Sequence, residues 1–246
     1  MKRFLVWCAL ALVIGFGARA GAQTPEDPAG APTSGVAAAP TVGDPGHWAI
    51  SLERAFGFDY VKETQSMAGV DQQTRSSTSF SLFSNPLSPL LSAFSFPRAG
   101  FDLFVAPGLS LGTSLGVFHG SQSATPTGGT ETSQSFTGVV VTPRIGYVAH
   151  LAPSISFWPR AGISIIYAST STSSGGTDTS QSSHLIAGTV EAPFVFTIAP
   201  RVAFTFGPTF DISFSGGSSA TLYGMSVTVD DKVLEIGAQA GLVITL

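Results

Sequence analysis

The sequence predicts an all-β protein, an eight-stranded antiparallel transmembrane β-barrel with short periplasmic turns and long extracellular loops. Three observations support this fold class. Apolar and small or polar residues alternate from residue 47 to the last residue, and a unit of 46 to 47 residues repeats along the chain. In addition, only 11% of the 246 residues are charged while 43% are hydrophobic, whereas about a quarter of the residues of a soluble domain are charged.

The alternation has the period of a β-strand. In the first strand the apolar residues share one parity, while the other parity holds small or polar residues such as Ser51, Gly57 and Asp59. A period of two gives a strand one apolar face. The last strand repeats the pattern over a longer stretch, with apolar residues at Leu234, Ile236, Ala238, Ala240, Leu242, Ile244 and Leu246.

The internal repeat fixes the number of strands. An Ala-Pro pair occurs at 106–107, 152–153 and 199–200, each time between two alternating runs, and proline ends strand pairing there as a tight turn. The polar run at 128–135 returns almost unchanged at 175–182. The repeat unit is therefore two strands, one polar loop and one short turn. The expected strands are 48–61, 96–105, 109–119, 137–151, 155–168, 184–198, 202–215 and 227–246.

The first 46 residues read as a signal peptide and a leader. Lys2 and Arg3 precede an apolar run at 4–17, and small residues follow up to Ala22, the pattern of a secretory signal. We expect cleavage after Ala22, with Ala20 as the alternative, and a Pro/Ala/Gly-rich periplasmic leader at 23–46. Cys8 falls within the signal, so the mature chain would fold without a disulfide. The barrel domain is expected at 47–246.

The parity that lacks large apolar residues decides between a membrane barrel and a secreted soluble β-sandwich. It consists of Gly, Ser, Ala and Thr with few charges, which is a poor soluble surface but fits a narrow eight-stranded lumen. The apolar parity then faces lipid, and closure leaves no unpaired strand edge. Aromatic residues near the strand ends would form the interfacial girdles: Trp48 and Phe157 on the turn side, and Tyr60, Tyr167 and Phe214 on the loop side.

On these features, residues 47–246 resemble the small outer-membrane β-barrel proteins of the OmpA/OmpX type. Leu246 stands where that family usually carries an aromatic residue. The resemblance implies the outer membrane of a Gram-negative bacterium, contact with outer-membrane lipid, and insertion by the barrel assembly machinery. A surface ligand would bind through the loops. The formal net charge of -4 with scattered cations argues against nucleic acid as a partner.

The inward charges are the main candidate site. Arg98, Arg144 and Glu191 each lie eight residues before the Ala of a turn, and Arg160 reaches a similar level. Glu53 and Glu235 belong to the first and last strands, which must pair when the barrel closes. We expect these six side chains to form a shared ion-pair network, because buried charge is tolerated only when it is paired. The network closes the lumen in one interpretation and opens transiently as a narrow gated channel in the other.

Arg54 conflicts with this pattern because it lies on the apolar parity in the middle of the first strand. Facing lipid, it would cost about 2–4 kcal/mol. Either a β-bulge turns it inward or it lies close to an interface.

Catalysis has weak support in the sequence, and we expect a protein without catalytic, cofactor-binding or metal-binding residues. A lipid-modifying hydrolase would need a serine beside a histidine, and His119 and His184 could supply the histidine near the loop-side rim. Serine is so common in these loops, at Ser121 and Ser183 for example, that such neighbours arise by chance. The four histidines show no zinc-ligand spacing.

The first loop, at 62–95, is unusually apolar, and two prolines, Pro86 and Pro89, interrupt it. Either the second strand begins early and the rest packs over the barrel mouth, or the segment binds the membrane interface or a partner. Its large apolar residues are Phe80, Leu82, Phe83, Leu87, Leu90, Leu91 and Phe94.

Overall fold

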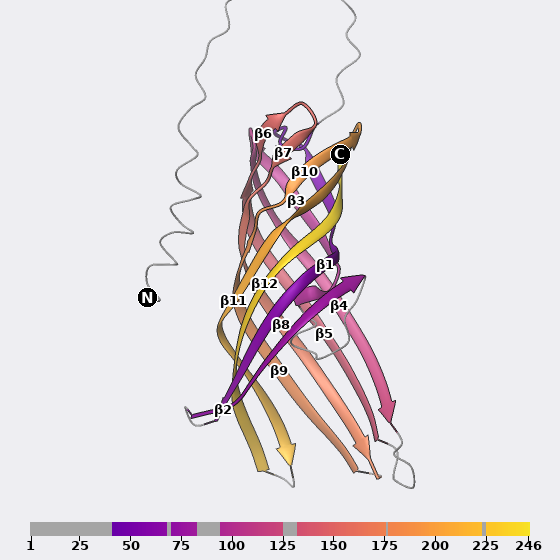
Figure 1. Cartoon of the computed structure of the whole chain (residues 1–246), viewed down its shortest axis with the longest axis vertical. Helices are drawn as coiled ribbons and strands as arrows, with labels where there is room; N and C mark the ends of the chain where they lie inside the picture. The colour runs from indigo at the N-terminus through magenta and orange to yellow at the C-terminus, as the bar shows by residue number, and fades with distance from the viewer. Residues whose placement is uncertain (1–40, 68–69, 83–93, 125–131, 176, 223–224) are drawn as a thin grey trace, which may run out of the picture. The chain divides into compact units, whose positions relative to one another are not determined.

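A computed structural model describes residues 41–67, 70–82, 94–124, 132–175, 177–222 and 225–246 (Figure 1). No helix among these residues is long and apolar enough to cross a membrane. The described strands are β1 (Trp48–Met67), β2 (Val70–Leu82), β3 (Arg98–Ala106), β4 (Leu109–Ala124), β5 (Thr132–Tyr147), β6 (Ala149–Ala152), β7 (Ile155–Phe157), β8 (Arg160–Ser174), β9 (Thr177–Glu191), β10 (Phe194–Ala199), β11 (Val202–Leu222) and β12 (Met225–Thr245).

These strands form a closed antiparallel barrel. Pairing runs in the order β1, β3, β4, β5, β8, β9, β11 and β12, and β12 pairs with β1 from Ala49↔Thr245 to Ser66↔Asp230. Three barrel strands are interrupted near the turn end. The short strands β6, β7 and β10 lie on the turn side of the interruptions, in line with β5, β8 and β9 respectively. Pro159 and Pro193 fall at two of these interruptions, where proline cannot donate to the ladder. The expected eight-stranded antiparallel barrel is confirmed.

The strands extend much further into the loop side than the sequence predicted. The polar segment between residues 168 and 184 was expected to be a loop, but β8 runs to Ser174 and β9 begins at Thr177. Serine and threonine hydroxyls bond across neighbouring strands here, as in Thr132–Ser174 at 3.0 Å and Ser182–Ser219 at 3.1 Å. Cross-strand hydroxyl pairs stabilise a sheet without any apolar face, so the alternation ends well before the strands do.

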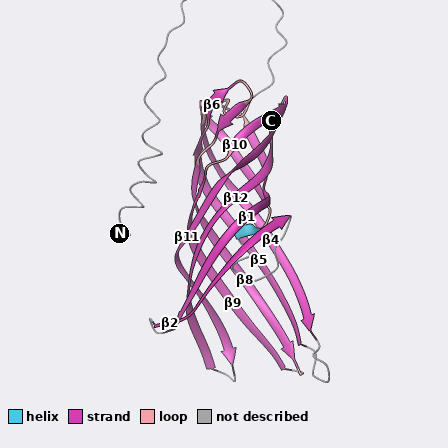
Figure 2. Ribbon diagram, in the orientation of Figure 1, coloured by secondary structure: helices cyan, strands magenta, loops and turns pink. Residues whose placement is uncertain are grey.

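The first predicted loop also contains strand. Its first residues continue β1 to Met67, and β2 returns antiparallel beside the loop-side half of β1, from Met67↔Val70 to Phe56↔Leu82. On the turn-side half β3 takes this place. Residues 83–93, which include several apolar residues of the predicted loop, lie outside the described residues. Phe94 and Ser95 form a short helical turn, seen in cyan in Figure 2, and both are buried.

The outer and inner faces of the barrel divide as the parity predicts. Apolar residues of the outward parity are exposed, including the predicted girdle residues Trp48, Tyr60, Tyr167 and Phe214, while Phe157 is half-buried. The inward parity holds a sequence of layers. An apolar layer at the turn end comprises Val42, Ala49, Phe104, Val148, Trp158, Val195, Ala203 and Val243.

Part of the expected leader packs at this turn end. Val42 belongs to the turn-end apolar layer, and the backbone around it is held by hydrogen bonds from Gly46 N to Phe104 O at 2.7 Å and from Gly108 N to Gly43 O at 2.9 Å. Gly43 and Gly46 have positive φ angles of 110° and 80°, a conformation that glycine adopts without strain. Residues 41–46 therefore behave as part of the barrel.

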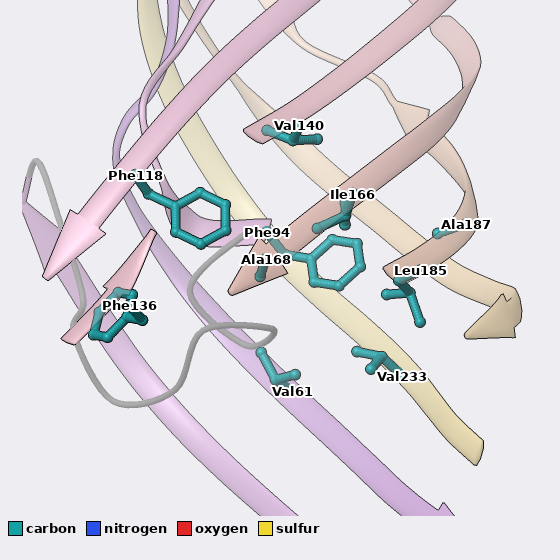
Figure 3. Close-up of a cluster of buried hydrophobic side chains, with 10 residues drawn as sticks. All are labelled: Val61, Phe94, Phe118, Phe136, Val140, Ile166, Ala168, Leu185, Ala187 and Val233. Carbon is teal, nitrogen blue, oxygen red and sulfur yellow. The ribbon is translucent and has the colours of Figure 1, made fainter. Parts of the chain in front are cut away.

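A second apolar layer lies inside the loop-side half (Figure 3). The ring of Phe94 lies among side chains contributed by the strands around it. This loop-side apolar layer was missed in the sequence, because its members occupy the inward parity that is polar elsewhere. It comprises Val61, Phe94, Phe118, Phe136, Val140, Ile166, Ala168, Leu185, Ala187 and Val233.

Glycine makes room for the aromatic rings of this layer. The Phe118 ring covers Gly138 on the paired strand, and any Cβ at Gly138 would overlap the ring. We expect Gly138→Leu to lower the free energy of unfolding by about 1–3 kcal/mol, the usual effect of overpacking. Urea unfolding followed by tryptophan fluorescence would measure it. Thr137→Leu, on the exposed face of the same strand, is the matched control, and equal losses in both variants would contradict the packing argument.

Candidate functional site: a charged layer inside the barrel

Between the two apolar layers, the lumen contains a layer of buried charge. Along β12 the inward residues pass from Val243 through Glu235 to Val233, and along β5 from Arg144 to Val140. Every member of this layer is at most 7% exposed. We call it the charged layer, and it comprises Glu53, Arg54, Asp59, Arg98, Asp102, Arg144, Arg160, Glu191, Asp211 and Glu235.

Glu53 is the common partner of two arginines. Its carboxylate receives a bidentate pair from Arg144, with Nη1 at 2.6 Å from Oε2 and Nη2 at 2.7 Å from Oε1, and Arg160 Nη1 lies 2.5 Å from Oε1. Arg144 also contacts Asp102 at 2.5 Å, and Arg160 Nη2 lies 2.7 Å from Glu191. Such charge-assisted, two-pronged bonds are the stronger hydrogen bonds in proteins. They connect β1 with β3, β5, β8 and β9 across the lumen.

Arg54 points into the lumen. The pairing of β1 with β12 shifts between Leu52 and Phe56, and Arg54 has a φ of 51°. This β-bulge reverses the side-chain direction at one residue, which confirms the first of the two interpretations of Arg54. The guanidinium lies 3.0 Å from Asp211, 3.2 Å from Glu191 and 3.5 Å from Glu235, and it donates to the carbonyl of Phe94.

The six residues proposed from the sequence all lie in the charged layer. Ion pairs join four of them, Glu53, Arg144, Arg160 and Glu191. Glu235 is joined to these through Arg54, and Arg98 Nη1 donates to Thr142 Oγ1 at 3.2 Å. The sequence left the direction of Arg54 open between two interpretations, and it did not identify Asp59, Asp102 and Asp211 as members of the layer. The three aspartates have the inward parity, so parity alone could have identified them.

Glycines make space for the arginines. The motif Pro-Arg-X-Gly places Gly100, Gly146 and Gly162 in the charged layer's walls. A Cβ at Gly100 would come within 2.7 Å of Arg144 Nη2, and one at Gly162 within 2.9 Å of Arg144 Cβ. At Gly146 the corresponding neighbour is Arg160 Cγ at 2.9 Å. Each of these glycines therefore lies against an arginine of another strand, and the motif serves lumen packing.

The candidate hydrolase residues are not brought together as a catalytic group. His119 lies on β4 and His184 on β9, with β5 and β8 between them. The Nδ1 atom of His119 hydrogen bonds to Thr137 Oγ1 at 2.8 Å, and the Ser183 hydroxyl bonds to Ser218 at 3.1 Å. Among the described residues, no group of three or more His, Cys, Asp or Glu side chains could hold a metal ion.

Two further buried acids, Glu63 and Asp231, lie on the loop side of the charged layer. The outward residues of β1 and β12 become charged at Lys62 and Lys232, and Glu63 and Asp231 are buried on the inward parity at this level. Burial raises the pKa of Glu63, and the nearby Asp231 raises it further. Burial likewise raises the pKa of Asp231. Burial therefore disfavours the ionised form of both carboxyl groups.

The raised pKa of Glu63 predicts a pH-dependent stability. Below its ordinary value of 4.5 the carboxyl is protonated in both states and contributes no penalty. As pH rises through the folded-state pKa, the native state must hold a disfavoured charge, so stability is lost. We expect Glu63→Gln to raise the unfolding midpoint in urea at pH 7 but not at pH 4. The exposed Asp230→Asn is the control, and a Glu63→Gln effect that is independent of pH would contradict the assignment.

The outer surface identifies the environment of the barrel. A belt of exposed apolar side chains surrounds it, bounded by aromatic residues at both ends, and in the described residues the strand order closes on itself through the pairing of β12 with β1. This combination satisfies the two requirements of a transmembrane β-barrel. The chain has the fold of the small outer-membrane β-barrels.

Comparison with known proteins finds similarity to several solved outer-membrane protein structures. Ail, the attachment invasion locus protein of Yersinia pestis, is 15% identical, with 82% of this chain and 100% of that chain covered and a TM-score of 0.37. The outer membrane protein OprG from Pseudomonas aeruginosa is 13% identical over 82% and 96%, with a TM-score of 0.45. The outer membrane protease OmpT from Escherichia coli is 9% identical over 81% and 96%, with a TM-score of 0.47. No family model matches the sequence, and no curated protein matches it.

Proposed function

We propose that this outer-membrane barrel is a non-enzymatic protein with a structural or surface-interaction role, and that the charged layer closes its lumen. The observation that carries the proposal is the set of ion pairs spanning the barrel interior, in which Glu53 on β1 binds Arg144 on β5 and Arg160 on β8. An ion that crossed the lumen would have to separate these partners. Removing one partner from a buried pair costs about 3–5 kcal/mol.

The two apolar layers support closure because they limit access of water to the charges. Trp158 and Phe104 pack on the turn side, with ring centroids 5.6 Å apart, and Phe94 is fully buried on the loop side. A small cavity of about 20 Å³ beside Glu53, Arg160 and Glu191 has room for one water molecule. An apolar constriction opposes ion passage by dewetting, so the three layers together favour a closed lumen over a conducting one.

The serine- and threonine-rich loop-side ends of β4, β5, β8 and β9, which we call the loop-side extension, support a role in surface contact. Outward hydroxyls stand side by side across four strands, with Ser121 opposite Ser135, Ser135 opposite Ser171, and Ser171 opposite Ser180. With the turn side in the periplasm of a Gram-negative bacterium, this surface would face outward from the cell. Hydroxyls donate and accept hydrogen bonds without charge, so the extension suits an uncharged polar partner.

Conductance in planar lipid bilayers tests the closed lumen. We expect the refolded wild-type protein to give no conductance above that of the lipid alone, because the ion pairs and apolar layers block the lumen. Arg144→Ala, which removes the partner of both Glu53 and Asp102, is expected to give measurable and cation-selective conductance. Lys232→Ala on the outer surface should leave the bilayer silent. Stepwise conductance of the wild-type protein would instead favour a narrow gated channel.

A further inference from the structure

The charged layer contains more acids than bases. Its six carboxyl groups belong to Glu53, Asp59, Asp102, Glu191, Asp211 and Glu235, and its four guanidinium groups to Arg54, Arg98, Arg144 and Arg160. If every group were ionised, the layer would carry two uncompensated negative charges in the buried interior of the barrel. An isolated buried charge is so unfavourable that the group neutralises instead. Arginine keeps its proton in proteins, so the compensation must come from the acids or from a bound cation.

Carboxyl oxygens without a hydrogen-bond donor indicate where the surplus negative charge lies. Asp59 Oδ2 and Glu235 Oε1 accept no hydrogen bond from a protein donor. Both residues are fully buried. The Glu235 carboxyl is nevertheless within hydrogen-bond reach of Asp59 on one side and Asp211 on the other. An ionised carboxylate only accepts hydrogen bonds. Two neighbouring carboxyl groups can therefore bond to each other only when one of them carries a proton.

The surroundings of this carboxyl trio offer too few cations to neutralise it. Arg54 on β1 and Arg98 on the neighbouring strand β3 both act electrostatically on Asp211 and Glu235, but both also act on Glu191 on β9, so two guanidinium groups serve the trio and Glu191 together. The other polar neighbours of Asp59 are neutral, namely Ser95 and the side-chain amide of Gln239. Glu63 and Asp231 are separated from the trio by Val61 and Val233 of the loop-side apolar layer. The water-sized cavity beside Arg54 is lined by none of the three carboxyls.

We propose that Asp59, Asp211 and Glu235 form a proton-binding site that holds two protons at neutral pH and thereby makes the charged layer electrically neutral. One proton lies between Asp59 and Glu235 and the other between Glu235 and Asp211. Two protons balance the two surplus carboxylates, and they also supply the two hydrogen bonds that the contacts require. A carboxyl chain of this kind parallels the sharing of protons by adjacent buried acids, where like charges cannot both ionise.

The site has a consequence for the lumen that rests on the proposed closed state. Release of both protons leaves three carboxylates that share Arg54 and Arg98 with Glu191, and repulsion then favours entry of water or cations. We therefore expect the closed lumen to begin conducting cations as the pH is raised above neutral. The direction is opposite to that of a lumen held shut by ion pairs alone, which acid would open by protonating Glu53 and Glu191.

Infrared spectroscopy tests the protons directly. The full-length protein is refolded in lipid vesicles with Glu63→Gln and Asp231→Asn in place, so that these two acids contribute no signal. We expect a carbonyl stretching band of protonated carboxylic acid at pH 7, shifted by exchange into D₂O and lost at alkaline pH. Adding Glu235→Gln lowers the surplus from two carboxylates to one and should remove about half of this band, and adding the exposed Asp230→Asn should not change it. Absence of the band at pH 7 would overturn the proposal in favour of a bound cation.

Conductance against pH separates this inference from the proposed function. A band at pH 7 together with a bilayer that conducts only at alkaline pH supports both. A band together with conductance at every pH supports the proton site and overturns the closed lumen. A silent bilayer at neutral pH without the band supports the closed lumen and overturns the proton site. The infrared titration needs only the acid-depleted background, so a folding failure of Glu235→Gln leaves the test intact.

Discussion

Glu53→Ala is expected to lower the free energy of unfolding by about 3–5 kcal/mol, the typical loss when one partner of a buried ion pair is removed. Glu53 binds both Arg144 and Arg160, so its removal leaves two guanidinium groups short of a counter-charge. Arg144 retains Asp102 and Arg160 retains Glu191, which limits the loss. Reversible urea unfolding in lipid vesicles, followed by tryptophan fluorescence, would measure the difference.

The controls for Glu53→Ala separate charge from packing. Asp230→Asn removes an exposed carboxylate from the outer surface and should change the free energy of unfolding by less than about 0.5 kcal/mol. Combining Glu53→Ala with Arg160→Ala should destabilise less than the sum of the two single variants, because the second change removes a charge that the first left unpaired. Strict additivity would show that the two side chains do not interact across the lumen.

Parity predicted the barrel and most of its charged layer. Glu53, Arg144 and Glu191 lie on strands with a clear period of two. In a closed barrel whose apolar residues face lipid, residues of the other parity face the lumen. The number of strands followed from the Ala-Pro turns, because proline near residues 107, 153 and 200 interrupts pairing at the same end each time. These inferences depend only on local sequence and on closure, which is why the structure agrees with them.

The features that were missed depend on contacts distant in sequence. Phe94 is 40 residues from Arg54, yet its carbonyl accepts from that guanidinium inside the lumen. Arg54 on the apolar parity indicates an irregularity in the first strand, but the nearby sequence does not decide between a bulge and a position close to an interface. The serine-rich hairpins lack an apolar face, so their sequence predicts loops, but backbone pairing continues wherever neighbouring strands hold the register. Sequence period therefore gives the lipid-facing part of a strand and not its full length.

Arg54→Leu is the most direct test of the bulge and of the charge balance together. With the side chain directed inward, the change leaves Asp211, Glu191 and Glu235 without their shared cation, and we expect a loss of about 3–5 kcal/mol in the free energy of unfolding. If the side chain instead faced lipid, leucine would stabilise the barrel by about 2–4 kcal/mol. The sign of the change in a urea titration thus decides between the two orientations.

The companion variant for Arg54→Leu restores the charge count. Adding Asp211→Asn removes one carboxylate for the one guanidinium lost, so we expect part of the stability to return, whereas Arg54→Leu with Asp230→Asn on the outer surface should show no recovery. Arg54→Lys keeps the charge but loses the planar fork that reaches several carboxylates at once, and it should fall between wild type and Arg54→Leu. Equal stability of the lysine and leucine variants would show that geometry, and not charge, makes this position essential.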